Sequence, residues 1–249
     1  MTGPRPNTRA FHIPIVTCAI GLCAGGCAPD AGRTVTVCGR PYHAEPIWTS
    51  NLSGPQAAAG YVVEGTSEVA VRDGFYFIDA RHGERHFATV WLPGDYPANI
   101  RIRYVARCPA PAGARNINLF FHARLSDGRD VLDESNRRTG EYSQYHHFPN
   151  YILTYLGDDR LRVRMRRDPG FELLTETYLP GGVPLDTDVE LEVRVADGCI
   201  EYHELRPHKR LLLRHHDPHP LNGGRVALRT WKTHVGYRDI RIDRLVPVD

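Results

Sequence analysis

The most regular feature of this chain is a series of short segments in which apolar and polar residues alternate. From 189 to 195 aliphatic residues alternate with charged ones, and Asp197-Gly198 follows. An Asp-Gly pair supplies the positive φ angles that a two-residue hairpin turn requires. The same arrangement surrounds Asp73-Gly74, so the pattern predicts two β-hairpins.

Further segments with this alternation, or with continuous apolar character, predict additional strands. They span residues 86–92, 98–108, 116–124, 150–156, 160–166, 209–215, 225–231 and 237–245. No segment has a helical period of useful length. Many short strands without strand–helix alternation predict an all-β fold, either a two-sheet antiparallel sandwich or a barrel.

The N-terminal stretch has the pattern of an export signal. Arg5 and Arg9 precede an apolar run at 13–22, and small residues then lead to Cys27. The run is too short to span a membrane as a stable helix. Ala24-Gly25-Gly26-Cys27 resembles a lipobox, in which the cysteine is lipidated. We therefore predict an export signal at 1–27 and a lipid anchor on Cys27, so that the mature protein is a lipoprotein of the outer or cell surface. The alternative is a periplasmic or secreted protein without lipid.

The rest of the chain is expected to form one domain. Residues 28–45 are rich in Gly, Pro and Ala, a composition typical of a flexible tether. The domain is predicted from 46 to 249, a length that does not require a second domain. Cys38, Cys108 and Cys199 would remain after processing, and an odd number leaves at least one thiol unpaired.

The composition excludes several classes of function. With 31 Lys+Arg against 29 Asp+Glu the net charge is +2, too small for the basic surface of a nucleic-acid-binding protein. The sequence has neither a CxxC pair nor an HExxH motif, so we predict no metal site and no cofactor. Nearly all of the positive charge is arginine, and a guanidinium pairs well with the carboxylate of a uronic acid.

The longest irregular stretch, 126–149, is rich in Asp, Arg, Tyr and His. A loop of this length inside a compact sandwich is usually functional or disordered, and its aromatic content disfavours disorder. Aromatic faces stack on sugar rings, while hydroxyls and amides bind sugar hydroxyls. We therefore predict a carbohydrate-binding groove. Its expected contact residues are Tyr142, Asn150, Tyr151, Tyr155, Trp231 and His234.

Several short strings of the chain are similar to those of a known family. They are 119–121, Trp91 with Pro93, Arg138-Thr139-Gly140-Glu141-Tyr142 with Tyr145-His146, Arg166 before Gly170-Phe171, and 237–239. Together they resemble the uncharacterised YesU-like proteins over about residues 48–245. The resemblance implies a concanavalin A-like lectin/glucanase jelly roll and a place in the breakdown of plant or algal polysaccharide. It implies no catalytic mechanism.

The candidate chemistry is β-elimination from an acidic polysaccharide. This reaction needs a base and a group that neutralises the uronate carboxylate. Tyr145 or His146 is the expected base, with Arg138 or Arg166 as the carboxylate clamp. The alternative for Tyr145-His146 is a packed anchor of the loop. We expect these four side chains to converge on one concave groove.

A histidine on one strand and a set of arginines on another enter this hypothesis in different ways. His122 alternates with Leu119 and Phe121, so one expectation places it on the groove face, where it could move a proton. The other expectation is a hydrogen-bonded structural histidine. Arg160, Arg162 and Arg164 share one face of a strand with Arg166. For most of these arginines the expected environment is a solvated outer surface.

Two other functions remain open at this point, so the sequence does not decide whether the chain is an enzyme. The same aromatic groove could hold glycan at the cell surface without catalysis. A glycoside hydrolase is the third hypothesis, although the Glu-x-Asp-x-x-Glu string of laminarinase-type jelly rolls is absent. Its two carboxylates would have to come from separate strands.

Overall fold

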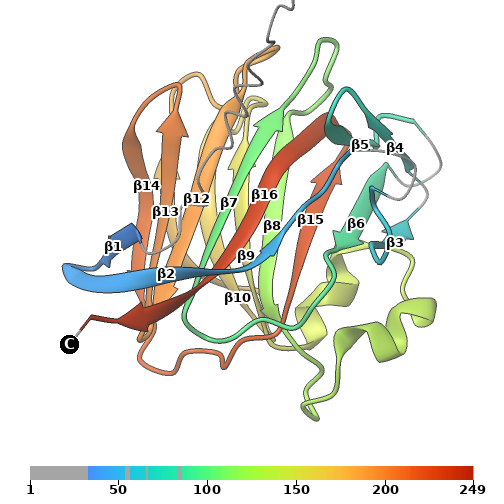
Figure 1. The fold of residues 1–249 in the computed structure, drawn as a ribbon. Helices are drawn as coiled ribbons and strands as arrows, with labels where there is room; N and C mark the ends of the chain where they lie inside the picture. The colour runs from blue at the N-terminus through green and yellow to red at the C-terminus, as the bar shows by residue number, and fades with distance from the viewer. Residues whose placement is uncertain (1–32, 54–56, 66, 83–85, 249) are drawn as a thin grey trace, which may run out of the picture. The chain divides into compact units, whose positions relative to one another are not determined.

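The computed structural model describes residues 33–53, 57–65, 67–82 and 86–248, which belong to one compact unit, 31–249. Two antiparallel sheets stack face to face (Figure 1), which confirms the predicted all-β sandwich. The predicted signal and Cys27 lie outside the described residues. Within those residues, no helix has the length and apolar character needed to cross a membrane.

The larger sheet, sheet A, has nine strands. Along its main path the order is β1 (Arg33–Val37), β2 (Arg40–Thr49), β16 (His234–Pro247), β7 (Ile100–Arg107), β12 (Val189–Ala196), β13 (Cys199–Arg206) and β14 (Arg210–His216). The hairpin of β4 (Glu68–Arg72) and β5 (Phe75–Asp79) joins the sheet through β16.

The smaller sheet, sheet B, has seven strands. Their order is β11 (Glu172–Tyr178), β10 (Arg162–Asp168), β9 (Asn150–Leu156), β8 (Asn116–Ala123), β15 (Arg225–Trp231), β6 (Phe87–Trp91) and β3 (Val62–Gly65). Two short 3-10 helices, η1 (Val131–Arg137) and η2 (Tyr142–His147), lie in the connection from β8 to β9. They are yellow-green in Figure 1 and lie at one end of the molecule.

Both predicted hairpins are present. Asp73-Gly74 connects β4 to β5, and Asp197-Gly198 connects β12 to β13. All four residues have positive φ, with Asp73 at 52° and Asp197 at 49°. These are the angles that fit the right-handed twist of the flanking strands.

The main core lies between the sheets and follows the alternation of the strands. On β8, Ile117, Leu119 and Phe121 point into this core, while the intervening side chains point to the opposite face of sheet B. A second apolar cluster lies on that opposite face and includes Phe120, Ile152 and Tyr145. Sheet B is therefore buried on both faces near η2, and its outer face is open elsewhere.

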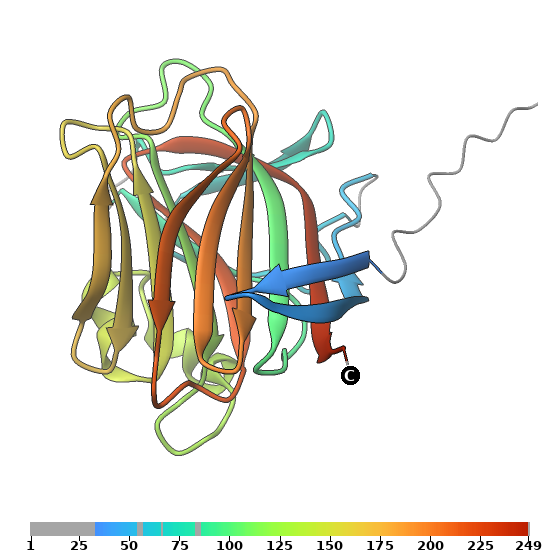
Figure 2. The same cartoon turned by 90° about the vertical axis from the view of Figure 1, so that its left-hand side faces the viewer.

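The domain begins earlier than the sequence predicted. Strands β1 and β2 occupy residues 33–45 of the predicted tether, and in Figure 2 their blue hairpin runs crosswise to the neighbouring strands. Val35 and Val37 are buried against Ala196 and Leu245. The composition of 28–45 concealed this strand because the Thr-Val alternation at 34–37 is only four residues long.

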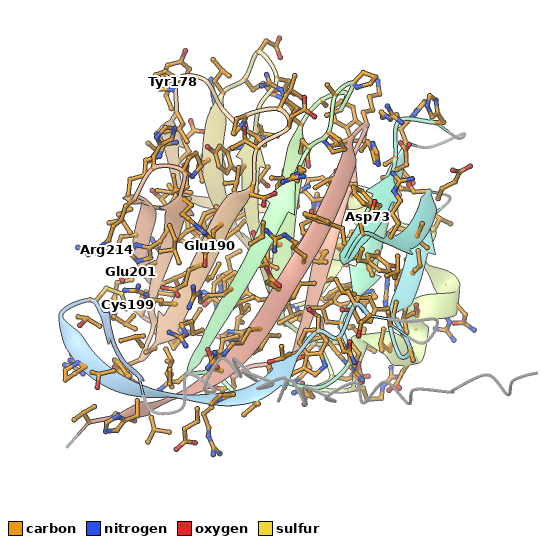
Figure 3. All side chains as sticks on the ribbon, turned by 45° about the horizontal axis from the view of Figure 1, so that its top comes forward. Asp73, Tyr178, Glu190, Cys199, Glu201 and Arg214 are labelled. Carbon is orange, nitrogen blue, oxygen red and sulfur yellow. A yellow bond between two sulfur atoms is a disulfide. The ribbon has the colours of Figure 1, made fainter. Side chains whose placement is uncertain are left out.

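A disulfide between Cys38 and Cys199 joins the β1–β2 turn to β13, and Cys108 is a buried free thiol. Glu201 reinforces the junction, since it accepts hydrogen bonds from the Cys38 amide at 3.3 Å and from the Arg214 guanidinium. Figure 3 shows Glu201 and Arg214 beside Cys199 on sheet A. The N-terminal hairpin is thus a fixed part of the sheet.

Candidate functional site

Four polar residues form a straight line across the outer face of sheet B. Arg229 of β15 pairs with Asn118 of β8, Asn118 pairs with Thr154 of β9, and Thr154 pairs with Arg164 of β10. Directly paired residues point to the same face of a sheet. These four side chains, the polar row, therefore run perpendicular to the strands.

The polar row forms the floor of a pocket with a volume of about 460 Å³, within the usual range for ligand sites. Side chains from the η2 region form one wall, and aromatic residues of β6 and β15 form another. Besides the row, the lining residues are Phe87, Asn116, Glu141, Tyr142, Ser143, His146, Arg160 and Trp231.

An apolar row beside the polar row fixes the position of η2. Its paired residues are Trp91, Ala227, Phe120 and Ile152. Tyr145 of η2 packs on it, with ring centroids 5.1 Å from Phe120 and 6.2 Å from Trp91. The Asn150 amide also donates to the carbonyls of Tyr145 and Phe148, at 2.8 and 2.9 Å. The η2 wall is therefore held to the sheet by packing and by hydrogen bonds.

Two arginines of the polar row have no partner of opposite charge. Among the arginines whose side chains the structure describes, Arg164 and Arg229 alone make no hydrogen bond or ion pair with a described residue. Arg229 is only 3% exposed, and its guanidinium lies 4.4 Å from the ring centroid of Tyr142. Burial lowers the pKa of both groups, yet arginine stays charged in proteins.

The pocket lining as a whole is cationic. Arg160, Arg164 and Arg229 face a single carboxylate, that of Glu141. Arg160 is held by Asp158, with Nε 2.9 Å from a carboxylate oxygen, and its guanidinium lies 5.5 Å from the Trp231 ring. The positive charge that remains favours an anionic ligand.

His146 and Tyr142 stand side by side in the η2 wall. Their ring centroids are 4.6 Å apart in an edge-on arrangement, and His146 stacks on Phe171 at 3.9 Å. Burial, helped by the charges of Arg229, His147 and Arg166, lowers the pKa of His146 to about 4. The imidazole is therefore neutral at pH 7. Its Nε2 is buried without a partner, which leaves Nδ1 as the nitrogen available to a ligand.

The four residues expected to converge form two pairs, His146 with Arg166 and Tyr145 with Arg138, which point to different places. His146 lines the pocket. Arg166 lies next to it, with its guanidinium 3.9 Å from the ring centroid of Phe171 and 2.8 Å from the Phe171 carbonyl oxygen. Tyr145 precedes His146 in η2 and points the other way, because successive residues of a 3-10 helix point about 120° apart. Arg138, the C-terminal cap of η1, points to the same partner as Tyr145. The predicted convergence is therefore wrong for Tyr145 and Arg138.

Tyr145 and Arg138 bind a buried carboxylate instead. The Tyr145 hydroxyl donates to Glu64 at 2.6 Å, and the Arg138 guanidinium donates to Glu64 at 2.7 Å. Ser135 of η1 donates to the same carboxylate at 2.6 Å. Burial and the Glu64 charge raise the pKa of Tyr145 far above its ordinary value, so this phenol stays protonated at neutral pH and cannot take up a proton. We name Glu64, Ser135, Arg138 and Tyr145 the Glu64 network.

His122 lies in the main core, and its expected groove position is wrong. Its φ is +53°, and the pairing of β8 with β15 shifts register at this point. The irregularity turns the ring towards Phe121 and Tyr151, at 5.2 and 5.9 Å between centroids. Burial lowers the pKa of His122 to about 3.

The predicted sugar contacts divide into two groups. Tyr142 and Trp231 line the pocket. The others lie elsewhere. Asn150 holds η2, and His234 lies on β16, 3.1 Å from an Arg72 nitrogen. In the core, the Tyr151 hydroxyl donates to Asp217 at 2.6 Å and the Tyr155 hydroxyl donates to the Gly182 carbonyl. Alternation explains the two tyrosines, because on β9 the odd-numbered positions face the core.

Sequence reasoning missed Arg229, Asn116, Asn118, Thr154, Phe87 and Glu141, and it assigned Arg160 and Arg164 to a solvated surface. A signal was present for three of them. Asn116 and Asn118 interrupt the otherwise apolar run 116–121, and Arg229 follows Val226-Ala227-Leu228. A polar residue within an apolar strand is either paired or functional.

The fold is one that carbohydrate-related structures share. Similar solved structures include a Bacillus subtilis protein of unknown function with a galectin-like fold (20% identity, TM-score 0.73, 83% of this chain and 100% of that one). A second is carbohydrate-binding module CBM66 from Bacillus subtilis, with 10% identity and a TM-score of 0.54 over 74% of this chain and 95% of that one. A third is endo-β-1,3-glucanase from Pyrococcus furiosus, with 10% identity and a TM-score of 0.57 over 86% of this chain and 99% of that one. At these identities the similarity concerns the fold, a jelly roll.

Residues 45–203 match the family model described as a domain of unknown function, DUF1961. The chain belongs to this family. The comparison with curated proteins found no match. The YesU-like name from the sequence stays a resemblance.

We expect Glu64→Gln to lower the free energy of unfolding by about 3–5 kcal/mol, because it leaves the buried Arg138 guanidinium without a counter-charge. Urea unfolding measures this change. Glu176→Gln is the matched control, since its pair with Arg162 is exposed and such pairs contribute about 0–1 kcal/mol. Equal losses in the two variants would contradict a stabilising role for the Glu64 network.

Burial of His122 gives the fold a pH dependence. The pKa of His122 is about 3 in the folded state against an ordinary value of 6.5, so below pH 6.5 the unfolded chain binds a proton that the native state does not. Stability should therefore fall as the pH is lowered from 6.5 towards 3. Between pH 7 and about 4.5, the free energy of unfolding should fall by about 2–3 kcal/mol less in His122→Leu than in the wild type. Unfolding at both pH values measures this, and an equal loss in the exposed-site variant His43→Leu and in His122→Leu would refute it.

Proposed function

We propose that the pocket binds an acidic sugar residue of a polysaccharide. The observation that carries this proposal is Arg229, which is 3% exposed and has no hydrogen bond or ion pair to a described residue. A buried charge without a partner is strongly unfavourable. A ligand carboxylate would supply that partner, because its two oxygens match the planar guanidinium fork.

The remaining lining is suited to a sugar ring. Tyr142, Trp231 and Phe87 offer aromatic faces, while Asn116, Asn118 and Thr154 offer amide and hydroxyl groups. Apolar surface with a few placed polar groups is the usual composition of such a site. The titles of two structures with the same fold, a carbohydrate-binding module and an endo-β-1,3-glucanase, also support a carbohydrate ligand.

A second candidate function, β-elimination, is favoured by the position of His146 and Tyr142 beside the cationic floor. Arg229 would hold the uronate carboxylate and so acidify the C5 proton. His146 would take this proton at Nδ1, the C4–O4 bond would break as the C4–C5 double bond forms, and the Tyr142 hydroxyl would protonate the leaving oxygen. The step needs no other reactant.

This scheme changes the roles predicted from the sequence. Arg229 replaces Arg138 as the clamp, and His146 remains the base while Tyr145 is excluded by its bond to Glu64. Arg166 positions Phe171, on which His146 stacks. Glycoside hydrolysis is less well supported, because it needs two carboxylates and Glu141 is the one carboxylate among the lining residues.

Export is the cellular setting that we propose for this activity. The disulfide between Cys38 and Cys199 supports it, because disulfides persist in oxidising compartments. The lipid anchor on Cys27 rests on the sequence alone. Lipid labelling of the wild-type chain and of Cys27→Ala tests that anchor.

We expect Arg229→Gln to weaken binding of uronate oligosaccharides by about 10- to 100-fold, since it removes a charge-assisted hydrogen-bonded pair. Isothermal titration calorimetry measures this loss. Arg162→Gln is the control, because Arg162 is exposed and does not line the pocket. If Arg229→Gln binds as tightly as Arg162→Gln, Arg229 does not recognise the carboxylate.

If the chain is a lyase, His146→Gln and Tyr142→Phe should each lower turnover by about 100-fold or more, the usual scale for loss of an acid or base group. The ultraviolet absorbance of the unsaturated product follows the reaction, and titration shows whether the variants still bind. Wild-type protein that binds uronate oligomers but turns over none of a broad panel would rule out elimination and leave a binding module.

A further inference from the structure

The two arginines without partners stand at opposite ends of the polar row. Arg229 lies on β15 and Arg164 on β10, with β8 and β9 between them. Three inter-strand steps separate their Cα atoms by about 14 Å. Side chains on one face of a sheet extend roughly side by side, so two guanidinium groups on strands this far apart are better suited to two carboxylates than to one.

Arg164 is not an ordinary surface arginine. Its Nε is buried without a hydrogen-bond partner. Glu176 faces it across the strand pair but contacts Arg162 instead, at 3.3 Å. The carboxylate of Asp168, on the same strand, accepts from the Phe171 amide. Neither of these carboxylates therefore forms an ion pair with Arg164.

The residues between the two arginines are neutral and include a second unsatisfied group. Asn118 is 3% exposed, and its amide nitrogen donates to Asn116, but its Oδ1 is buried without a partner. Thr154 follows in the row. The row thus presents a cation, a neutral acceptor, a hydroxyl and a second cation, in that order.

We infer that the ligand is an oligosaccharide with acidic groups on at least two of its residues, lying along the polar row with one acidic group at Arg229 and another at Arg164. This rests on the proposed function, since it concerns the same pocket. The neutral middle of the row, Asn118 and Thr154, would face the hydroxyls of the sugars between the acidic groups.

The test compares oligomer lengths. We would titrate the full chain with monomers, dimers and trimers of galacturonic, glucuronic, mannuronic and guluronic acids, and with carboxyl-reduced trimers as neutral controls. The wild type should bind the best dimer or trimer at least about tenfold more tightly than its monomer. Arg164→Gln should reduce that ratio towards one, whereas Arg229→Gln should weaken monomer and oligomer together. Arg162→Gln, on the same strand, should keep the wild-type ratio.

The outcomes separate the two proposals. Monomer and oligomers that bind equally well, or an Arg164→Gln variant that keeps the full gain, would overturn the two-group inference and leave the acidic-sugar pocket standing. If no uronate of any length binds, or if carboxyl-reduced trimers bind as tightly as the acidic ones, the proposed function fails and the inference fails with it.

Discussion

The buried carboxylate of Glu64 is the contact on which the geometry of the site depends. It lies on β3, at one edge of sheet B, and it receives hydrogen bonds from η1, from η2 and from Arg138 between them. The long connection from β8 to β9 is thereby attached to a strand far from it in sequence. A buried ion pair contributes little stability compared with apolar packing, but its loss is costly and its geometry is specific. The position of His146 and Tyr142 over the sheet follows from that specificity.

The pattern of arginine pairing distinguishes the pocket from the rest of the described chain. Elsewhere in the described chain, arginines are paired even on the surface, as with Arg103 between Glu190 and Glu192 or Arg238 on Asp188. In such a molecule an arginine lacking a partner is informative, and both examples occur in one row of one sheet. Aromatic rings cover one of them, which limits its access to water. The site is therefore defined by charge that the protein does not neutralise.

The strands and both hairpins could be predicted because alternation and Asp-Gly turns are local features of the sequence. The site could be predicted only in part. Tyr142, His146 and Trp231 were found from composition, but Tyr145 and Arg138 follow the same motif and face a buried partner. Both side chains bind Glu64, which lies more than seventy residues away in sequence. His122 was misplaced because a bulge in β8 opposite Val226 reverses its direction.

The twist of sheet B has a consequence for the shape of any polymer that lies along the polar row. Neighbouring strands in a sheet rotate by about 20–25°, always in the same sense. Across the three steps from Arg229 to Arg164, the direction in which the side chains point turns by about 60–75°. A flat, ribbon-like polysaccharide would present its acidic groups in one plane and could meet only one end of the row well. The pocket would therefore discriminate between acidic polymers by their helical pitch as well as by their charge.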